Sequence, residues 1–270
     1  MNKPRVLITS ASRKVWLIRA FQQAGWHVIA QDADPDAVAL RFADERQCDI
    51  NINAWDADLI VPTRDAELDE FLRLSNHNDW KRVLVPNKET IRICTDKLAF
   101  YKFCKEHGFK TPEVYFVKPR ISQSGKETEC VWQEFVEGDE YSVDLFSDFQ
   151  GNVISVVPRK RLKVVSGESW VTMTVHSPLL LEHSVALASK LGLIGHNVLQ
   201  CFVTNQEVFW TDVNCRFGGA SLCAIKAGCN SPLWLRELIE GKKVKPRIGE
   251  YEIGLRMYRY TEDLFVKEPI

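Results

Sequence analysis

The stretch Thr211-Asp-Val-Asn-Cys-Arg-Phe-Gly-Gly219 carries the most information about the fold and the chemistry of this chain. Its first half has the character of a strand, in which Asp212 and Asn214 point to the same face, about 7 Å apart. Arg216 then leaves the strand end, and Gly218-Gly219 allows a tight turn whose backbone can approach a ligand closely. The stretch therefore predicts a strand end that presents a carboxylate, an amide and a guanidinium.

The run that precedes it, residues 197–203, is expected to pair with it as a hairpin across Thr204-Asn-Gln206. An even-length loop would place Gln200 opposite Thr211, whereas an odd loop or a bulge places it opposite Asp212, and we expect the second arrangement. Oxygen ligands from Asp, Asn and Gln suit magnesium, an ion that is commonly shared with substrate phosphates. The alternative is a solvated hairpin face with a glycine-rich turn.

Further stretches have residue types suited to a nucleotide or an anionic substrate. Residues 131–144 predict a strand and a bend, with backbone groups that could contact an adenine edge and a carboxylate beyond for ribose hydroxyls. Lys118 and Lys97 could contact phosphate, although lone lysines are usually on the surface. The basic run 157–169 could hold an anionic substrate. The corresponding structural alternatives are an acidic loop, surface lysines and a solvated edge strand.

The first 88 residues have the pattern of a small doubly wound domain. Short apolar runs alternate with a helical pattern, which predicts a βαβ unit and a parallel sheet. The expected strands cover 5–10, 27–31, 58–62 and 82–86, and the expected helix runs over 15–22 and is ended by Gly25.

The remaining residues, 89–270, are expected to form an α+β domain with antiparallel strands. Apolar residues at helical spacing predict one helix, and Ser177-Pro178 is a typical start for another. The expected helices cover 91–105, ended by Gly108, and 179–191, ended by Gly192; the expected strands, besides the hairpin above, cover 131–136, 141–147 and 153–158.

Charge and composition exclude several classes of protein. The 270 residues include 35 Lys and Arg against 36 Asp and Glu, so the basic excess typical of a nucleic-acid binder is missing. No apolar run reaches the roughly 20 residues that span a bilayer, and the N-terminal residues lack the pattern of a signal peptide. The 8 cysteines have neither zinc-finger nor disulfide-framework spacing, which favours buried, reduced thiols. We expect a cytoplasmic protein that acts on small molecules, alone or as a homodimer, with no nucleic-acid or membrane partner.

Taken in order, these pieces resemble the ATP-grasp superfamily, and within it the carbamoyl-phosphate-synthase-like branch. The family pattern E-x-N-P-R-x-G-G corresponds to D-V-N-C-R-F-G-G at 212–219. The other matching segments are VLITSASRKVWLIRAF, DADPDAVALRFAD, VPTRDAEL, CTDKLAFYKFCKEHGFKTP, KPR, VWQEFVEGDEYSVD and VPRKRLKVVSGES. The resemblance covers nearly the whole chain and implies an α/β, Rossmann-like pre-ATP-grasp domain over 1–88, followed by an α+β ATP-grasp domain over 89–270 with a reduced lid at about 112–136.

The resemblance also implies an activity and residue roles. A substrate carboxylate would attack the γ-phosphate of Mg²⁺-bound ATP to give an acyl phosphate, from which an amine or similar nucleophile displaces phosphate. Arg216 would be catalytic, and the implied metal ligands are Gln200, Asp212 and Asn214. The implied ATP contacts are Lys97, Lys118, Gln133, Glu134, Phe135, Val136 and Glu140, and the implied substrate contacts are Arg159, Arg161, Gly167, Glu168 and Ser169.

Three differences from the family pattern keep a second interpretation open. Asp212 stands where the family has Glu, and Cys215 stands where it has Pro. Only 13 residues separate Lys118 from Trp132, where the family lid has more strands and a helix. A short lid would exclude water poorly, which favours hydrolysis of ATP over ligation. The alternative is therefore a nucleotide-binding protein of this fold without ligase activity.

A less favoured alternative is a short-chain dehydrogenase. The segment Ile8-Thr-Ser-Ala-Ser-Arg-Lys14 resembles the first loop of those enzymes, and Tyr101-x-x-x-Lys105 resembles their catalytic pair. However, the loop lacks the glycines that let a backbone approach a pyrophosphate. The sequence therefore favours ATP over a nicotinamide cofactor.

Overall fold

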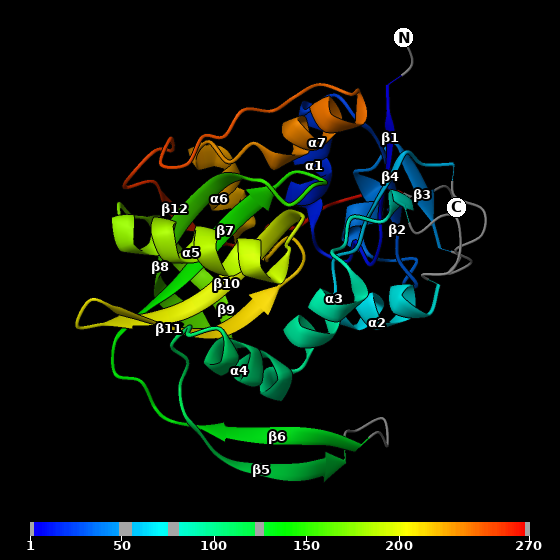
Figure 1. Cartoon of the computed structure of the whole chain (residues 1–270). Helices are drawn as coiled ribbons and strands as arrows, with labels where there is room; N and C mark the ends of the chain where they lie inside the picture. Colours follow the sequence, from blue (N-terminus) through cyan, green and yellow to red (C-terminus); the bar gives the residue numbers. More distant parts are fainter. Residues whose placement is uncertain (1–2, 49–55, 75–80, 122–126, 268–270) are drawn as a thin grey trace.

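The computed structural model of the chain describes residues 3–48, 56–74, 81–121 and 127–267. Its described strands form a four-stranded parallel sheet, a six-stranded antiparallel sheet and a separate two-stranded arm (Figure 1). Helices lie between and around the two larger sheets. The expected class, an α/β unit followed by an α+β unit with a reduced lid, is confirmed.

The parallel sheet has the strand order β3-β2-β1-β4. It is flanked by one helix on each face and by a short 3₁₀ helix. The strands are β1 (Arg5–Ile8), β2 (His27–Gln31), β3 (Glu45–Gln47) and β4 (Leu59–Val61), and the helices are α1 (Val15–Gln23), η1 (Val38–Arg41) and α2 (Asp65–Leu74).

The fourth strand of this sheet is not the expected one. Residues 82–86 contribute a single bridge, between Val83 and Ile60, and the outer position beside β2 belongs to β3, which the sequence pattern did not indicate. The N–H of Val85 bonds back to the carbonyl of Val83. Pro86 has no N–H to offer, so the segment cannot continue a ladder.

The antiparallel sheet has the order β11-β10-β7-β8-β9-β12. One of its faces is covered by helix α5 (Pro178–Leu191), which begins and ends where the sequence predicts, with Ser177 as N-cap and a left-handed Gly192 after the last turn. The strands are β7 (Asp139–Ser147), β8 (Val153–Val165), β9 (Glu168–Thr174), β10 (Gly195–Thr204), β11 (Glu207–Asn214) and β12 (Arg256–Tyr258).

The helix expected over 91–105 is interrupted. It forms two helices, α3 (Lys88–Thr95) and α4 (Lys97–Glu106), joined at Asp96. Asp96 has extended backbone, and its carboxylate accepts hydrogen bonds from the N–H groups of Leu98 and Ala99, as an N-cap does. The break therefore places Lys97 at the first position of α4.

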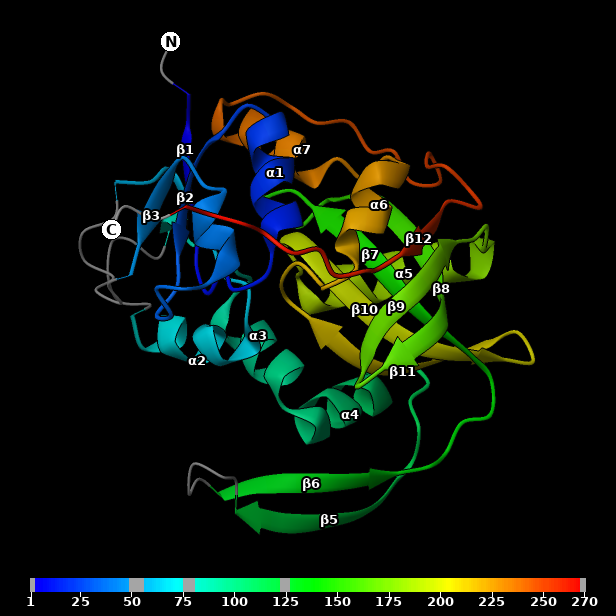
Figure 2. The ribbon, with the colours of Figure 1, turned by 180° about the vertical axis from the view of Figure 1, so that it is seen from behind.

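The expected lid region is a two-stranded arm. Strands β5 (Val114–Ile121) and β6 (Glu127–Gln133) pair only with each other and extend away from the rest of the molecule beyond α4 (Figures 1 and 2). The described part of the arm holds no helix. The predicted reduction of the lid is therefore visible as a bare hairpin.

Two hydrophobic clusters hold the molecule together, and each draws residues from both larger sheets. One includes residues of α3 and α5, and the other packs α1 against α6 (Ser221–Ala227) and α7 (Ser231–Ile239). The indole N–H of Trp26 also donates to the carbonyl of Pro232, 2.8 Å away. The two proposed domains therefore share their core, and a boundary near residue 88 stays a prediction.

Six of the described cysteines are buried and free, as expected; Cys48 is free and exposed. The buried ones are Cys94, Cys104, Cys201, Cys215, Cys223 and Cys229. Among the described helices, none is long and apolar enough to pass through a membrane.

Candidate functional site

The three expected metal donors lie on one face of the antiparallel sheet. Gln200 on β10 stands directly opposite Asp212 on β11, and the register shifts at a bulge immediately after Gln200. This is the pairing that the sequence predicted. Asn214 follows Asp212 by two residues and pairs with Val198, so its side chain projects from the same face. One carboxylate and two amides are thereby brought together at the edge of the sheet.

Arg216 lies just beyond these donors and contacts both halves of the molecule. Its Nε and one terminal nitrogen bond the two carboxylate oxygens of Asp65 at 2.8 and 2.5 Å. The same terminal nitrogen donates to the amide oxygen of Asn214 at 2.8 Å. A bidentate ion pair of this kind fixes the orientation of the guanidinium plane as well as its position. Asp65, the first residue of α2, was not identified from the sequence.

The charge of Asp212 is poorly compensated by the protein. Burial raises the pKa of its carboxyl group, the charge of Asp65 raises that pKa further, and Lys97 and Arg216 act in the opposite direction. No cation within the described residues forms an ion pair with Asp212. A half-buried carboxylate without an ion-pair partner is suited to bind a metal cation.

Arg216 faces loops at the carboxyl ends of β1 and β4. Because β1 lies between β2 and β4, this is the switch point of the parallel sheet, where open α/β sheets bind ligands. Lys14 lies here, and its ammonium donates to the carbonyl of Ser10. Burial lowers the pKa of Lys14; Arg216 and Arg64 lower it further, against the opposing charge of Glu67. The switch-point rule could have identified these residues from the expected strands.

The loop after β1 is held in an unusual backbone conformation. Ser10 and Ser12 have φ values of 44° and 48°, in the left-handed region that serine seldom adopts. The Ser10 hydroxyl donates to Glu67 at 2.8 Å, and the Ser12 N–H donates to Asp32 at 2.7 Å. Strained residues held by several partners concentrate at functional sites. The loop is therefore part of the candidate site.

Arg159, an expected substrate contact, is instead part of a buried ionic network. Its guanidinium is 1% exposed and bonds the carboxylate of Asp144 at 2.6 Å. The other oxygen of Asp144 is 2.9 Å from His196, whose ring stacks on Phe217 at 4.3 Å. Burial alone would raise the pKa of Asp144, but Arg159 and His196 lower it to about 2. The guanidinium has no surface to offer a ligand, and we leave Arg159 out of the site.

This network lies directly under the loop that carries Arg216. Phe217 is the next residue along the chain, and the Gly218 N–H donates to the hydroxyl of Ser221 at 2.9 Å. A Cβ on Gly218 would come within 2.9 Å of the Val198 side chain, so only glycine fits this turn without displacing its neighbour. The buried charges therefore help to fix the position from which Arg216 projects.

The other expected substrate contacts lie on the hairpin of β8 and β9. Arg161 is nearly buried, pairs with Glu140 at 2.7 Å and donates to the carbonyl of Gly167 at 2.6 Å. Glu168 pairs with Arg259, and Ser169 is buried. Glu140, the expected ribose contact, thus lies opposite Arg161 on the face of the sheet that carries the metal donors.

The segment expected to contact adenine connects the arm to β7. The Glu134 N–H donates to the carbonyl of Glu113, Phe135 is 88% exposed, and Val136 is buried. A Cβ on Gly138 would lie 2.7 Å from the carbonyl oxygen of Val203, so glycine lets this segment cross close to β10. Gln133 ends β6, and Lys118 pairs across the arm with Cys130; the side chain of Lys118 lies outside the described residues.

Comparisons with solved structures show that other proteins share this fold. Pyruvate carboxylase from Rhizobium etli superposes with a TM-score of 0.71 and 14% identity over 94% of this chain and 30% of that one. The phosphoribosylaminoimidazole carboxylase ATPase subunit from Aquifex aeolicus superposes with a TM-score of 0.69 and 18% identity, over 90% and 77% of the two chains. At such identities the likeness concerns the fold alone.

Sequence comparison then gives the family. Residues 126–262 match the sequence model described as "ATP-grasp in the biosynthetic pathway with Ter operon". The chain belongs to this ATP-grasp family. A curated relative, 3-methyl-D-ornithine–L-lysine ligase from Methanosarcina mazei, is 28% identical in an alignment 206 positions long that covers 64% of this chain and 54% of the relative. The chain thus matches about half the length of that relative.

Proposed function

We propose that the protein is an ATP-dependent, Mg²⁺-requiring carboxylate ligase that activates a small carboxylate as an acyl phosphate for attack by an amine. The observation that carries the proposal is the placement of Gln200, Asp212 and Asn214 on one face, with Arg216 beside them. The name of the Methanosarcina relative, a ligase that acts on amino acids, supports the same reaction class.

The donor set fits a magnesium ion. Three side-chain oxygens, of which one belongs to an under-compensated carboxylate, are the kind and charge of ligands that this ion takes in nucleotide sites. The Asn214 oxygen accepts one hydrogen bond from Arg216 and keeps a second lone pair. Gln200, Asp212 and Asn214 would hold the ion, which when bound neutralises the charge on phosphate oxygens.

The protein side chains would contribute mainly by position and charge. Arg216, fixed by Asp65, would stabilise the phosphoryl group and the acyl phosphate, and Lys97 would add a second cation close to Asp212. Glu140 and the segment from Gln133 to Val136 would contact ribose and adenine, and Lys118 would contact the phosphates. The loop with Lys14 would face the substrate carboxylate.

The proposal predicts that ATP consumption requires a carboxylate substrate. ADP release should rise at least tenfold when a suitable carboxylate joins Mg²⁺ and ATP, because attack on the γ-phosphate needs that nucleophile. Hydroxylamine should then convert the acyl phosphate to a hydroxamate, which a coloured ferric complex reports. A panel of free amino acids and other small carboxylates is the substrate source, and a reaction without Mg²⁺ is the control.

The alternative function is ATP binding or hydrolysis without ligation. It is favoured by the bare two-stranded arm, which has few backbone groups to cover the phosphates and exclude water. In that case ADP release would be insensitive to every carboxylate and no hydroxamate would form. The same assay therefore distinguishes the two functions.

The branch of the superfamily, the cellular location and the kind of substrate are also part of this proposal. We place the protein in the carbamoyl-phosphate-synthase-like branch and in the cytoplasm, with a small carboxylate and an amine or similar nucleophile as its partners. The balanced charge of 35 basic against 36 acidic residues supports a small-molecule rather than a nucleic-acid partner.

A further inference from the structure

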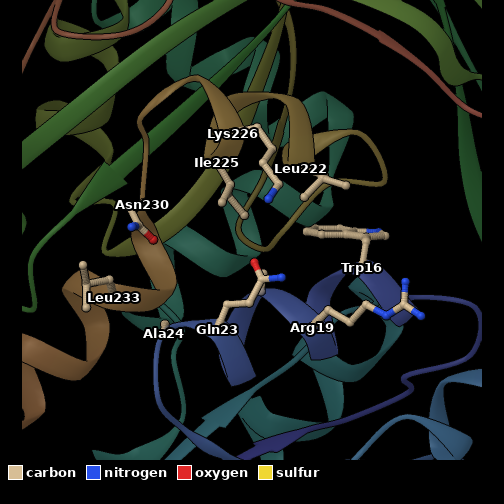
Figure 3. A pocket seen from close by; sticks show the side chains of 10 residues that line it. Trp16, Arg19, Gln23, Ala24, Leu222, Ile225, Lys226, Asn230 and Leu233 are labelled. Atoms are coloured by element: carbon tan, nitrogen blue, oxygen red, sulfur yellow. The ribbon is translucent and has the colours of Figure 1, made fainter.

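A pocket of about 510 Å³ lies between α1 and the pair α6–α7, outside the candidate site (Figure 3). Its apolar lining comes from the ring of Trp16 on α1 and from the side chains of Leu222, Ile225 and Leu233 on α6 and α7. The volume is within the range of small-molecule sites in proteins, roughly 300–1,000 Å³. The pocket brings together residues from the two halves of the molecule, which are far apart in sequence.

Three polar side chains converge on this pocket without a partner. Figure 3 shows the ammonium of Lys226 and the amide of Gln23 pointing toward one another across it, with Asn230 at the side opposite Trp16. Among the described residues, none makes a hydrogen bond or ion pair with these three side chains. Asn230 occupies the N-cap position of α7, yet its side chain makes no capping bond. Its amide is therefore free to serve a ligand.

The charge of the pocket limits the ligand. Of the two cations among the described residues that line the pocket, Lys226 is directed into it, whereas the guanidinium of Arg19 is turned away and lies over the ring of Phe42, 4.8 Å from the ring centre. One ammonium and two amide NH₂ groups match the oxygens of a carboxylate better than a doubly charged phosphate. The indole of Trp16 offers a flat surface for a planar ring.

We propose that this pocket binds a small carboxylate with a planar ring, the ring lying against Trp16 and the carboxylate between Lys226, Gln23 and Asn230. A ligand held in this way contacts α1 on one side and α6 and α7 on the other. It therefore stabilises the junction of the two halves. The inference is independent of the ligase reaction, since none of these residues belongs to the site around Arg216.

Calorimetric titration of the full chain with indole-3-acetate tests the proposal. The expected result is saturable, one-to-one binding. Hexanoate, which has the charge without the ring, and tryptamine, which has the ring with the opposite charge, should each bind at least tenfold more weakly. Absence of saturable binding by indole-3-acetate, or equal binding of hexanoate, would overturn the proposal.

Variants locate the bound probe. Lys226→Met and Trp16→Leu should each weaken indole-3-acetate at least tenfold, whereas Lys190→Met should not, because Lys190 is also an exposed lysine in the last turn of a helix but lies on α5. Arg216→Ala should bind the probe as the wild type does. Loss of binding in Arg216→Ala but not in Lys226→Met would place the probe in the candidate ligase site and refute this pocket.

Discussion

Replacing Asp212 with Ala is expected to lower Mg²⁺-dependent ATP turnover by about a thousandfold. The carboxylate is the one charged donor among the three, and the stabilisation of phosphoryl transfer by a bound metal amounts to several kcal/mol. Because burial raises the pKa of Asp212, its ionised form costs the folded state free energy at neutral pH. The variant should therefore unfold at the same or a higher temperature than the wild type.

Steady-state ADP release and thermal unfolding together check this prediction. Glu207→Ala is a matched control, because it removes an exposed carboxylate at the other end of the same strand. It should keep wild-type turnover. A correctly folded Asp212→Ala protein with more than a tenth of the wild-type rate would show that this carboxylate does not hold the metal.

Replacing Arg159 with Met is expected to cost about 3–5 kcal/mol of folding free energy at pH 7, because it leaves the buried carboxylate of Asp144 without its cation. The pKa of Asp144 is about 2 in the folded wild type, which is below its ordinary value. The ionised carboxylate therefore stabilises the folded wild type at neutral pH, and this stabilisation is lost as the pH falls toward 2. In the variant, burial should instead raise this pKa. The difference in folding free energy between the wild type and Arg159→Met should therefore be smaller at pH 4 than at pH 7.

Urea unfolding at both pH values measures this difference. Arg247→Met removes the arginine of an exposed ion pair at 3.6 Å and should change stability by less than about 1 kcal/mol. Should the Arg159 variant prove too unstable to purify, the double variant Arg159→Met/Asp144→Asn offers a second measurement: with both charges removed, no buried charge is left unpaired, and part of the stability should be recovered. A pH-independent deficit would contradict the electrostatic origin of the effect.

Local signals in the sequence predicted much of the fold. Helix α5 follows from Ser177-Pro178 and Gly192, and the hairpin of β10 and β11 follows from two apolar runs around a short polar loop. Because side chains alternate between the two faces of a strand, the two-residue spacing of Asp212 and Asn214 was enough to place their side chains on one face. These features depend on neighbours in the chain, which a sequence displays directly.

Other features depend on tertiary contacts that the sequence does not display. Arg159 stands in a basic run that is typical of a solvated strand, and only the position of Asp144 on the adjacent strand explains its burial. The pairing of Arg216 with Asp65 joins residues 151 positions apart. The break at Asp96 did have a local signal, since a Thr-Asp before a helical run is typical of an N-cap, but the continuous apolar period obscured it.

The most direct test of the account is a titration of the protein with Mn²⁺ in the presence of a non-hydrolysable ATP analogue, followed by electron paramagnetic resonance. Mn²⁺ takes the place of Mg²⁺ and reports the ion itself, independently of any substrate. The account predicts one tight site in the wild type and in Glu207→Ala, weakened at least tenfold by Asp212→Ala and measurably by Gln200→Ala and Asn214→Ala. Equal Mn²⁺ affinity in all five proteins would contradict it.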